Sequence, residues 1–240
     1  MAQDLLRPSA FARGSWMERG RHAWGVGAIA LAVACLSPRG WAAEVKVDIT
    51  SAGRPVSEAV VSLHAATGTT TRTATARMEQ QHSTFVPGVL PVQVGTTVTF
   101  PNRDNIQHHV YSFSQPKQFE IPLYSGNGAA PLRFDKPGVV VVGCNIHDWM
   151  IGHIVVLDTP YFAKTPASGN VRLDVPPGTY TLRVWHARGS GAPVTRSLTV
   201  PATGTATAVQ IPLEPAKEEP RGSDRLRALQ EKFRKAERSP

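Results

Sequence analysis

The chain has 240 residues, of which 41% are hydrophobic and 18% charged, and its formal net charge is +8. This composition predicts a mostly folded chain that holds one large or two small domains. Its excess Lys and Arg residues are scattered and do not form a stripe with aromatic residues, which argues against nucleic-acid binding and favours solubility or docking of an acidic partner.

The first 43 residues predict an export signal. Four early arginines precede an apolar run over residues 24–36, and small residues follow up to Ala42 and Ala43. This order is typical of a cleaved signal peptide, and the apolar run is too short for a membrane span. We expect cleavage after Ala42 or Ala43 and a periplasmic protein. Lipoprotein processing at Cys35 is the alternative, because residues 32–35 loosely resemble a lipobox.

Export changes the meaning of the two cysteines. The signal carries Cys35, five arginines and two acidic residues, so its removal lowers the net charge from +8 to +5 and leaves Cys144 alone. A single cysteine cannot form a disulfide within one chain, although exported proteins normally pair their cysteines. Cys144 is therefore a candidate metal ligand, and the alternative is an ordinary buried thiol.

From residue 44 to about residue 213 the pattern predicts β-strands, because short runs rich in Val, Thr, Phe and Tyr are separated by Gly and Pro. We expect strands at 45–49, 59–63, 92–94, 97–100, 139–142, 151–157, 171–175 and 180–184, with a turn at Gly95. The continuously apolar run 139–142 predicts a strand buried on both sides. Pro176-Pro177-Gly178 predicts a hairpin between the last two strands. Strands at this spacing indicate a sandwich or barrel.

After residue 213 the sequence becomes polar and Pro-rich, and then strongly charged. Residues 223–237 match a helix capped by Ser223, with a narrow apolar stripe on one side. We therefore expect residues 214–240 to form a charged tail that is either flexible or helical.

One short segment and two upstream histidines contain the candidate metal ligands of the chain. Cys144 ends a predicted strand, and His147 and Met150 lie in the turn that follows it. With His108 or His109 they offer a thiolate, two imidazoles and a thioether, which is the ligand set of a mononuclear electron-transfer copper site. A buried thiol, a turn histidine and a core methionine would explain each residue separately, but not their joint spacing.

Several motifs together resemble the plastocyanin-type cupredoxins. They are Phe85-Val86-Pro87, Val94-Gly95, Val98-Thr99-Phe100, Asn102, His108-His109-Val110 and Cys144-x-x-His147-x-x-Met150-x-Gly152. The two-residue gaps around His147 are similar to those of the amicyanins. The longer runs 108–114, 119–124 and 143–150 together resemble exported proteins called methylamine utilization proteins. The resemblance covers residues 80–158, and it implies a Greek-key β-sandwich with one type 1 copper.

The resemblance also bears on the choice between the two upstream histidines. In plastocyanin-like proteins Asn and Val follow the ligand, so matching Val110 to that Val makes His108 the ligand. His109 then replaces the Asn that normally braces the cysteine loop. Strand alternation gives the same choice, since His108 and Val110 point to one side and His109 to the other. The expected copper ligands are His108, Cys144, His147 and Met150, with His109 as the alternative to His108.

Asp148 is a second departure from the family pattern, because the amicyanin loop has Pro at this position. A buried, ionised carboxylate beside His147 would orient the imidazole and lower the reduction potential, whereas an exposed one would only cap the turn. Four of the five other histidines lie after the predicted signal, lack partner spacing and are interpreted as surface or strand residues: His64, His82, His153 and His186.

The flanking parts of the chain resemble a carboxypeptidase-regulatory-like module of immunoglobulin type. Residues 45–66 resemble its opening strands and residues 165–200 its closing strands. This implies a cupredoxin domain at 76–158, inserted in a second β-sandwich made of 44–75 and 159–213. The alternatives are one enlarged sandwich or a linear N-terminal extension.

These features predict an exported one-electron carrier between periplasmic redox partners, such as a dehydrogenase and a cytochrome. We do not expect an enzyme, because the sequence lacks a nucleophile elbow, a metalloprotease helix, a phosphate loop and the repeated His-x-His pairs of multicopper oxidases. The first alternative is a periplasmic copper-binding or delivery protein without electron transfer, which would favour an open Cu(I) site. The second is a structural module with a vestigial metal site.

Overall fold

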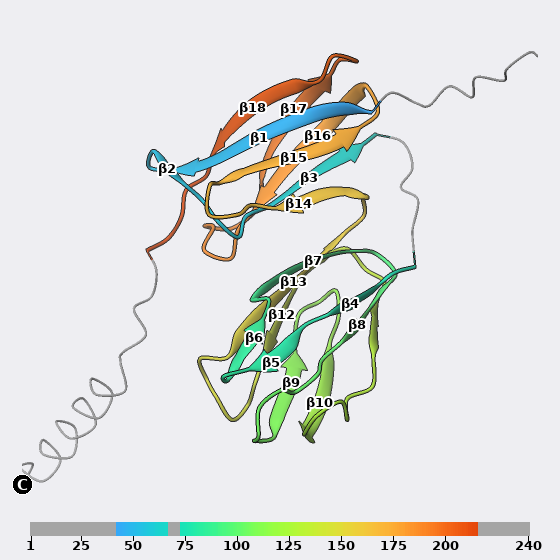
Figure 1. Ribbon diagram of the computed structural model, residues 1–240, viewed down its shortest axis with the longest axis vertical. Helices are drawn as coiled ribbons and strands as arrows, with labels where there is room; N and C mark the ends of the chain where they lie inside the picture. The colour runs from blue at the N-terminus through green and yellow to red at the C-terminus, as the bar shows by residue number, and fades with distance from the viewer. Residues whose placement is uncertain (1–41, 67–72, 216–240) are drawn as a thin grey trace, which may run out of the picture. The chain divides into compact units, whose positions relative to one another are not determined.

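The computed structural model describes residues 42–66 and 73–215, and these residues form eighteen β-strands and no helix. The predicted all-β class is confirmed. Hydrogen bonding arranges the strands in five sheets, and the two largest hydrophobic core clusters assign these sheets to two groups (strand labels in Figure 1). The predicted signal peptide and charged tail lie outside the described residues, apart from residues 42–43 and 214–215.

The first group combines strands from two distant parts of the chain. They are β1 (Ala43–Ser51), β2 (Arg54–Pro55), β3 (Val60–Ala65), β14 (Tyr161–Lys164), β15 (Asn170–Val175), β16 (Gly178–Trp185), β17 (Val194–Val200) and β18 (Thr205–Gln210). One sheet has the order β15-β1-β18, with β2 paired to β1, and the other has the order β14-β3-β16-β17. The alternating residues Val45, Val47 and Ile49 of β1 are buried in a core that also contains Leu63 and Leu182, as the period of two predicts.

The prediction of a hairpin at Pro176-Pro177-Gly178 is wrong, because β15 and β16 do not pair with each other. β15 pairs with β1, whereas β16 pairs with β3 and β17, so this turn carries the chain from one sheet to the other. Both prolines lack the backbone N–H that a tight hairpin would use. Instead, the Tyr180 hydroxyl donates to the Pro176 carbonyl oxygen at 2.7 Å and stabilises the turn between β15 and β16.

The second group contains every strand between these two parts. They are β4 (Thr75–Arg77), β5 (Glu79–Gln81), β6 (Thr84–Val86), β7 (Val89–Gln93), β8 (Thr96–Thr99), β9 (His108–Ser112), β10 (Phe119–Tyr124), β11 (Leu132–Phe134), β12 (Gly138–Gly143) and β13 (Ile151–Leu157). The order β10-β9-β12-β13-β7 forms a five-stranded sheet, β11-β8-β4 forms a three-stranded one, and β5 pairs with β6. Gly95 has a φ of 90° and turns the chain between β7 and β8, as expected. Phe100, Phe134 and Ile154 belong to the core of this group.

β12 is not buried on both sides, although its unbroken valine run predicted this. Val140 and Val142 are fully buried, whereas Val141 is 43% exposed. β12 lies in antiparallel register with β13, and its pleat turns alternate side chains toward the core and outward. This one-sided burial also places the Cys144 side chain on the core side, because residues two positions apart in a strand share a face and Val142 is buried.

Candidate metal centre

Cys144 leaves β12 on the core side, where its side chain is buried. The loop that follows is closed by two backbone hydrogen bonds: the Cys144 N–H donates to the Met150 carbonyl at 3.2 Å, and the Met150 N–H donates to the His147 carbonyl at 2.9 Å. Gly143 and Ile151 pair across the base of the loop, where β12 meets β13. The short loop therefore holds His147 and Met150 beside the thiol.

His108 and His109 face opposite sides of β9, as their alternation predicts. His108 is fully buried, and its Nδ1 lies 3.8 Å from Cys144 Sγ. His109 points to the other face, where its Nε2 lies 2.9 Å from Glu120 Oε1. The structure thus brings His108, and not His109, to the cysteine.

His147 completes a compact group of three donor atoms. Its Nδ1 lies 3.9 Å from Cys144 Sγ, and the three donors of His108, Cys144 and His147 all lie within 4.8 Å of one another. A metal at the centre of a trigonal set, with metal–sulfur and metal–nitrogen bonds of about 2.3 and about 2.0 Å, needs sulfur–nitrogen separations of about 3.7 Å. The two measured separations are close to this value, so the donor set fits one first-row transition metal ion.

Met150 and Asp148 occupy opposite environments in the loop. Met150 is buried in the same core cluster as Cys144, so a thioether lies within the core that surrounds the three donors. Asp148 is exposed, and solvent therefore screens its charge. Asp148 is therefore not the buried carboxylate that would lower the reduction potential of the metal.

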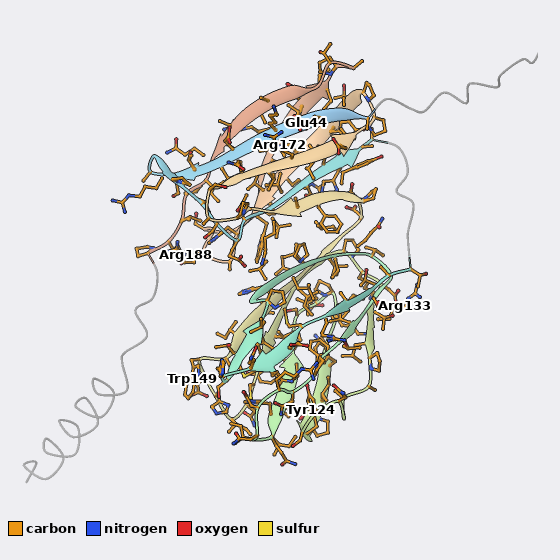
Figure 2. The ribbon with its side chains drawn as sticks, viewed as in Figure 1. Glu44, Tyr124, Arg133, Trp149, Arg172 and Arg188 are labelled. Atoms are coloured by element: carbon orange, nitrogen blue, oxygen red, sulfur yellow. The ribbon has the colours of Figure 1, made fainter. Side chains whose placement is uncertain are left out.

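His147 lies closer to solvent than His108 does. His147 is half-buried, its loop neighbours Ile146 and Trp149 are exposed, and the centroids of the His147 and Trp149 rings are 5.0 Å apart in an edge-on arrangement. Figure 2 shows Trp149 at the outer edge of the second strand group. The donor set therefore has one deeply buried imidazole and one imidazole near an apolar surface.

Asp104 is the site residue that the sequence analysis missed. Its Oδ2 lies 2.8 Å from His108 Nε2. Burial alone would raise the pKa of Asp104, but hydrogen bonds from the Ser83 N–H, the His108 ring and the His82 N–H lower it below its usual value. The one available signal was an acidic residue four positions before His108. That spacing has no meaning for side-chain contact outside a helix, and residues 101–107 are not helical.

The other histidines of the described segments lie outside this donor group. His64 is a buried residue of β3 whose Nε2 lies 2.9 Å from Ser62 Oγ and whose Nδ1 lies 2.7 Å from Asp158 Oδ1. Burial lowers the pKa of His64, with a smaller contribution from Arg183 and opposition from Asp158. His64 is thus a strand residue, as interpreted, but the structure gives it partners that its sequence spacing did not reveal.

No protein-family model matches the chain, and no curated protein matches it. Similar solved structures include a purple cupredoxin from Nitrosopumilus maritimus, with 26% identity over 34% of this chain and 99% of that chain and a TM-score of 0.31. A copper-containing nitrite reductase from Thermus scotoductus SA-01 shows 30% identity over 34% of this chain and 22% of that chain, with a TM-score of 0.32. An oxidized point variant of amicyanin shows 26% identity over 34% of this chain and 80% of that chain, with a TM-score of 0.32.

Proposed function

We propose that this chain is an exported type 1 copper protein that carries single electrons between redox partners. The observation that carries the proposal is the buried group of one thiol and two imidazole nitrogens, with sulfur–nitrogen separations of 3.8 and 3.9 Å. Copper held by such donors supplies a one-electron Cu(II)/Cu(I) couple. Cys144 would hold the copper as the thiolate and His108 and His147 would hold it through Nδ1, while Met150 would supply a weakly binding thioether.

The burial of the donors favours electron transfer over copper delivery. His108, Cys144 and Met150 are almost inaccessible to solvent, whereas a delivery site has to expose its metal to another protein's ligands. The strand pairing around the 144–150 loop also holds the donors in place before the metal binds. A preformed and closed donor set suits a metal that changes charge without changing its ligands.

We also propose that the chain is built from two β-domains and is exported to the periplasm. Residues 76–158 are the cupredoxin domain, and 44–75 with 159–213 form the immunoglobulin-like module around it. The hydrogen bond from Tyr180 to Pro176 supports the immunoglobulin-like assignment, because a tyrosine that bonds to the backbone just upstream is a hallmark of immunoglobulin-type corners.

A signal peptide over residues 1–43 sends the chain to the periplasm, where a dehydrogenase or cytochrome exchanges electrons with it. Within residues 42–66 and 73–215, no helix is long and apolar enough to cross a membrane.

The spectra of the purified protein after addition of Cu(II) test the proposal. We expect one copper per chain, an intense thiolate-to-copper absorption in the visible range and a narrow copper hyperfine splitting by EPR. Cys144→Ala and His108→Ala should abolish the absorption, whereas the matched variant His109→Ala should keep it.

Three other results would contradict electron transfer through a type 1 copper. A colourless protein that retains only Cu(I) would support copper delivery. A protein that keeps its colour after Cys144→Ala would exclude a type 1 site at Cys144, and a protein that binds no copper would exclude both functions.

A further inference from the structure

The second ring nitrogen of His108 faces a carboxylate rather than a carbonyl or water. Asp104 Oδ2 lies 2.8 Å from His108 Nε2, and the Asp104 side chain is only 12% exposed. An ionised carboxylate only accepts hydrogen bonds, so this contact requires the proton of a neutral imidazole to be on Nε2. Nδ1, which faces Cys144 Sγ, then has a free lone pair for a metal.

The turn between β5 and β6 holds the carboxylate from the other side. His82 and Ser83 both have a φ of 53°, a left-handed conformation that is uncommon for residues other than glycine. Two such residues in succession form the two-residue turn of a tight hairpin. The turn directs the His82 N–H to Asp104 Oδ1 at 2.7 Å and the Ser83 N–H to Oδ2 at 2.9 Å. Both carboxylate oxygens therefore have donors other than His108.

Asn102 holds the backbone of the same loop. Its Oδ1 accepts the Asp104 N–H at 2.9 Å, and its Nδ2 donates to the carbonyls of Ile106 at 2.7 Å and Tyr124 at 3.0 Å. Asn102 is itself buried. A rotation of the Asp104 side chain would break its hydrogen bonds to His82, Ser83 and His108, while Asn102 holds the Asp104 backbone in place.

We infer that Asp104 is a positioning residue that selects the Nε2-protonated tautomer of His108 and lowers the reduction potential of the copper. Its negative charge makes the His108 imidazole a stronger donor, and it favours the more highly charged oxidised metal over the reduced one. The His82–Ser83 turn holds the carboxylate in this role. This inference rests on the proposed function.

The chain supplies a matched control in the neighbouring histidine. His109 Nε2 lies 2.9 Å from Glu120 Oε1, so the two pairs have the same chemistry and nearly the same length. His109, however, points away from Cys144, and Glu120 is 74% exposed at the side chain. Glu120→Gln therefore removes a carboxylate charge from the same sheet without changing His108.

The main experiment compares Asp104→Asn with Glu120→Gln in the full mature protein loaded with copper. Asn has one oxygen where Asp has two, so it cannot accept the His82, Ser83 and His108 donors at both positions. We expect Asp104→Asn to weaken copper binding by about 10- to 100-fold. We also expect the Cu(II)/Cu(I) equilibrium to move about tenfold toward Cu(I), which is about 59 mV for one electron. Glu120→Gln should leave both quantities unchanged.

A second measurement needs no copper and separates the inference from the proposed function. Nitrogen-15 NMR of the metal-free protein should show His108 as the single Nε2-protonated tautomer in the wild type and in Glu120→Gln, and as a mixture in Asp104→Asn. If the wild type binds no copper, the proposed function fails, while this spectrum still reports whether Asp104 selects the tautomer.

Two results would overturn the inference. One is an Asp104→Asn protein whose potential and copper affinity equal those of Glu120→Gln. The other is a wild-type His108 that carries its proton on Nδ1 or exchanges between tautomers. The wild-type spectrum alone gives the second result, so the inference can be overturned even if Asp104→Asn does not fold.

Discussion

At the scale of single residues, the two adjacent histidines of β9 show how strand alternation separates two environments. His108 enters the core and meets Cys144 and Asp104, whereas His109 meets Glu120 on the outer face. The sequence could predict which of them turns inward, because alternation is a local property of the strand. It could not predict that Asp104 holds His108, because that contact depends on the path of the loop between them.

Met150→Leu tests the axial role of the thioether. Leu keeps the apolar volume in the core but removes the sulfur, so we expect the blue absorption to persist and the reduction potential to rise. Voltammetry measures the shift. Met78→Leu is the matched control, because Met78 is a fully buried methionine of the same core cluster but lies outside the ligand loop. Equal potentials in the two variants would argue against Met150 as a copper ligand.

At the scale of elements, β12 and the β15–β16 connection show where local patterns mislead. A run of valines looks the same whether one face of a strand is buried or both, and only the neighbouring strands decide. Likewise, two alternating strands joined by Pro-Pro-Gly look like a hairpin in the sequence. In the structure they lie in different sheets, because Val175 and Tyr180 both face one core from opposite sides of the turn.

The one-sided burial of β12 leads to a stability prediction. Val142→Ala should lower the free energy of unfolding by about 2 kcal/mol, because it removes buried methyl groups and leaves a cavity beside the ligand loop. Val141→Ala, on the outward face of the same strand, should change it by less than about 0.5 kcal/mol. Urea denaturation monitored by circular dichroism measures both values. Similar losses in the two variants would indicate that both faces are buried.

At the scale of the whole molecule, hydrogen bonds join segments that are far apart in the sequence. β1 pairs with β15 and β18, and β3 pairs with β14 and β16. The Thr165 hydroxyl donates to the Val56 carbonyl at 2.7 Å and accepts the Ala59 N–H at 2.9 Å. The segment before β4 and the segment after β13 are therefore hydrogen-bonded to each other.

The pairing of β1 leads to a prediction for the cleavage site of the proposed signal peptide. Ala43 is buried, opens β1 and pairs with Val175, so cleavage after Ala42 keeps the first strand whole. If the proposed export occurs, we expect mass spectrometry of the protein purified from cells to show a chain that begins at Ala43. Cys35→Ser should leave that mass unchanged, whereas a lipidated chain that begins at Cys35 would show lipoprotein processing instead.

The sequence by itself determined the all-β class, most strand positions, the loop shared by Cys144, His147 and Met150, and the inward direction of His108. These features depend on the spacing of neighbouring residues, which a strand or a short loop converts directly into geometry. Only the tertiary structure decided which sheet each strand joins, that β12 is buried on one face, and that Asp104 meets His108. These features depend on contacts between segments far apart in the chain, whose pairing no local period encodes.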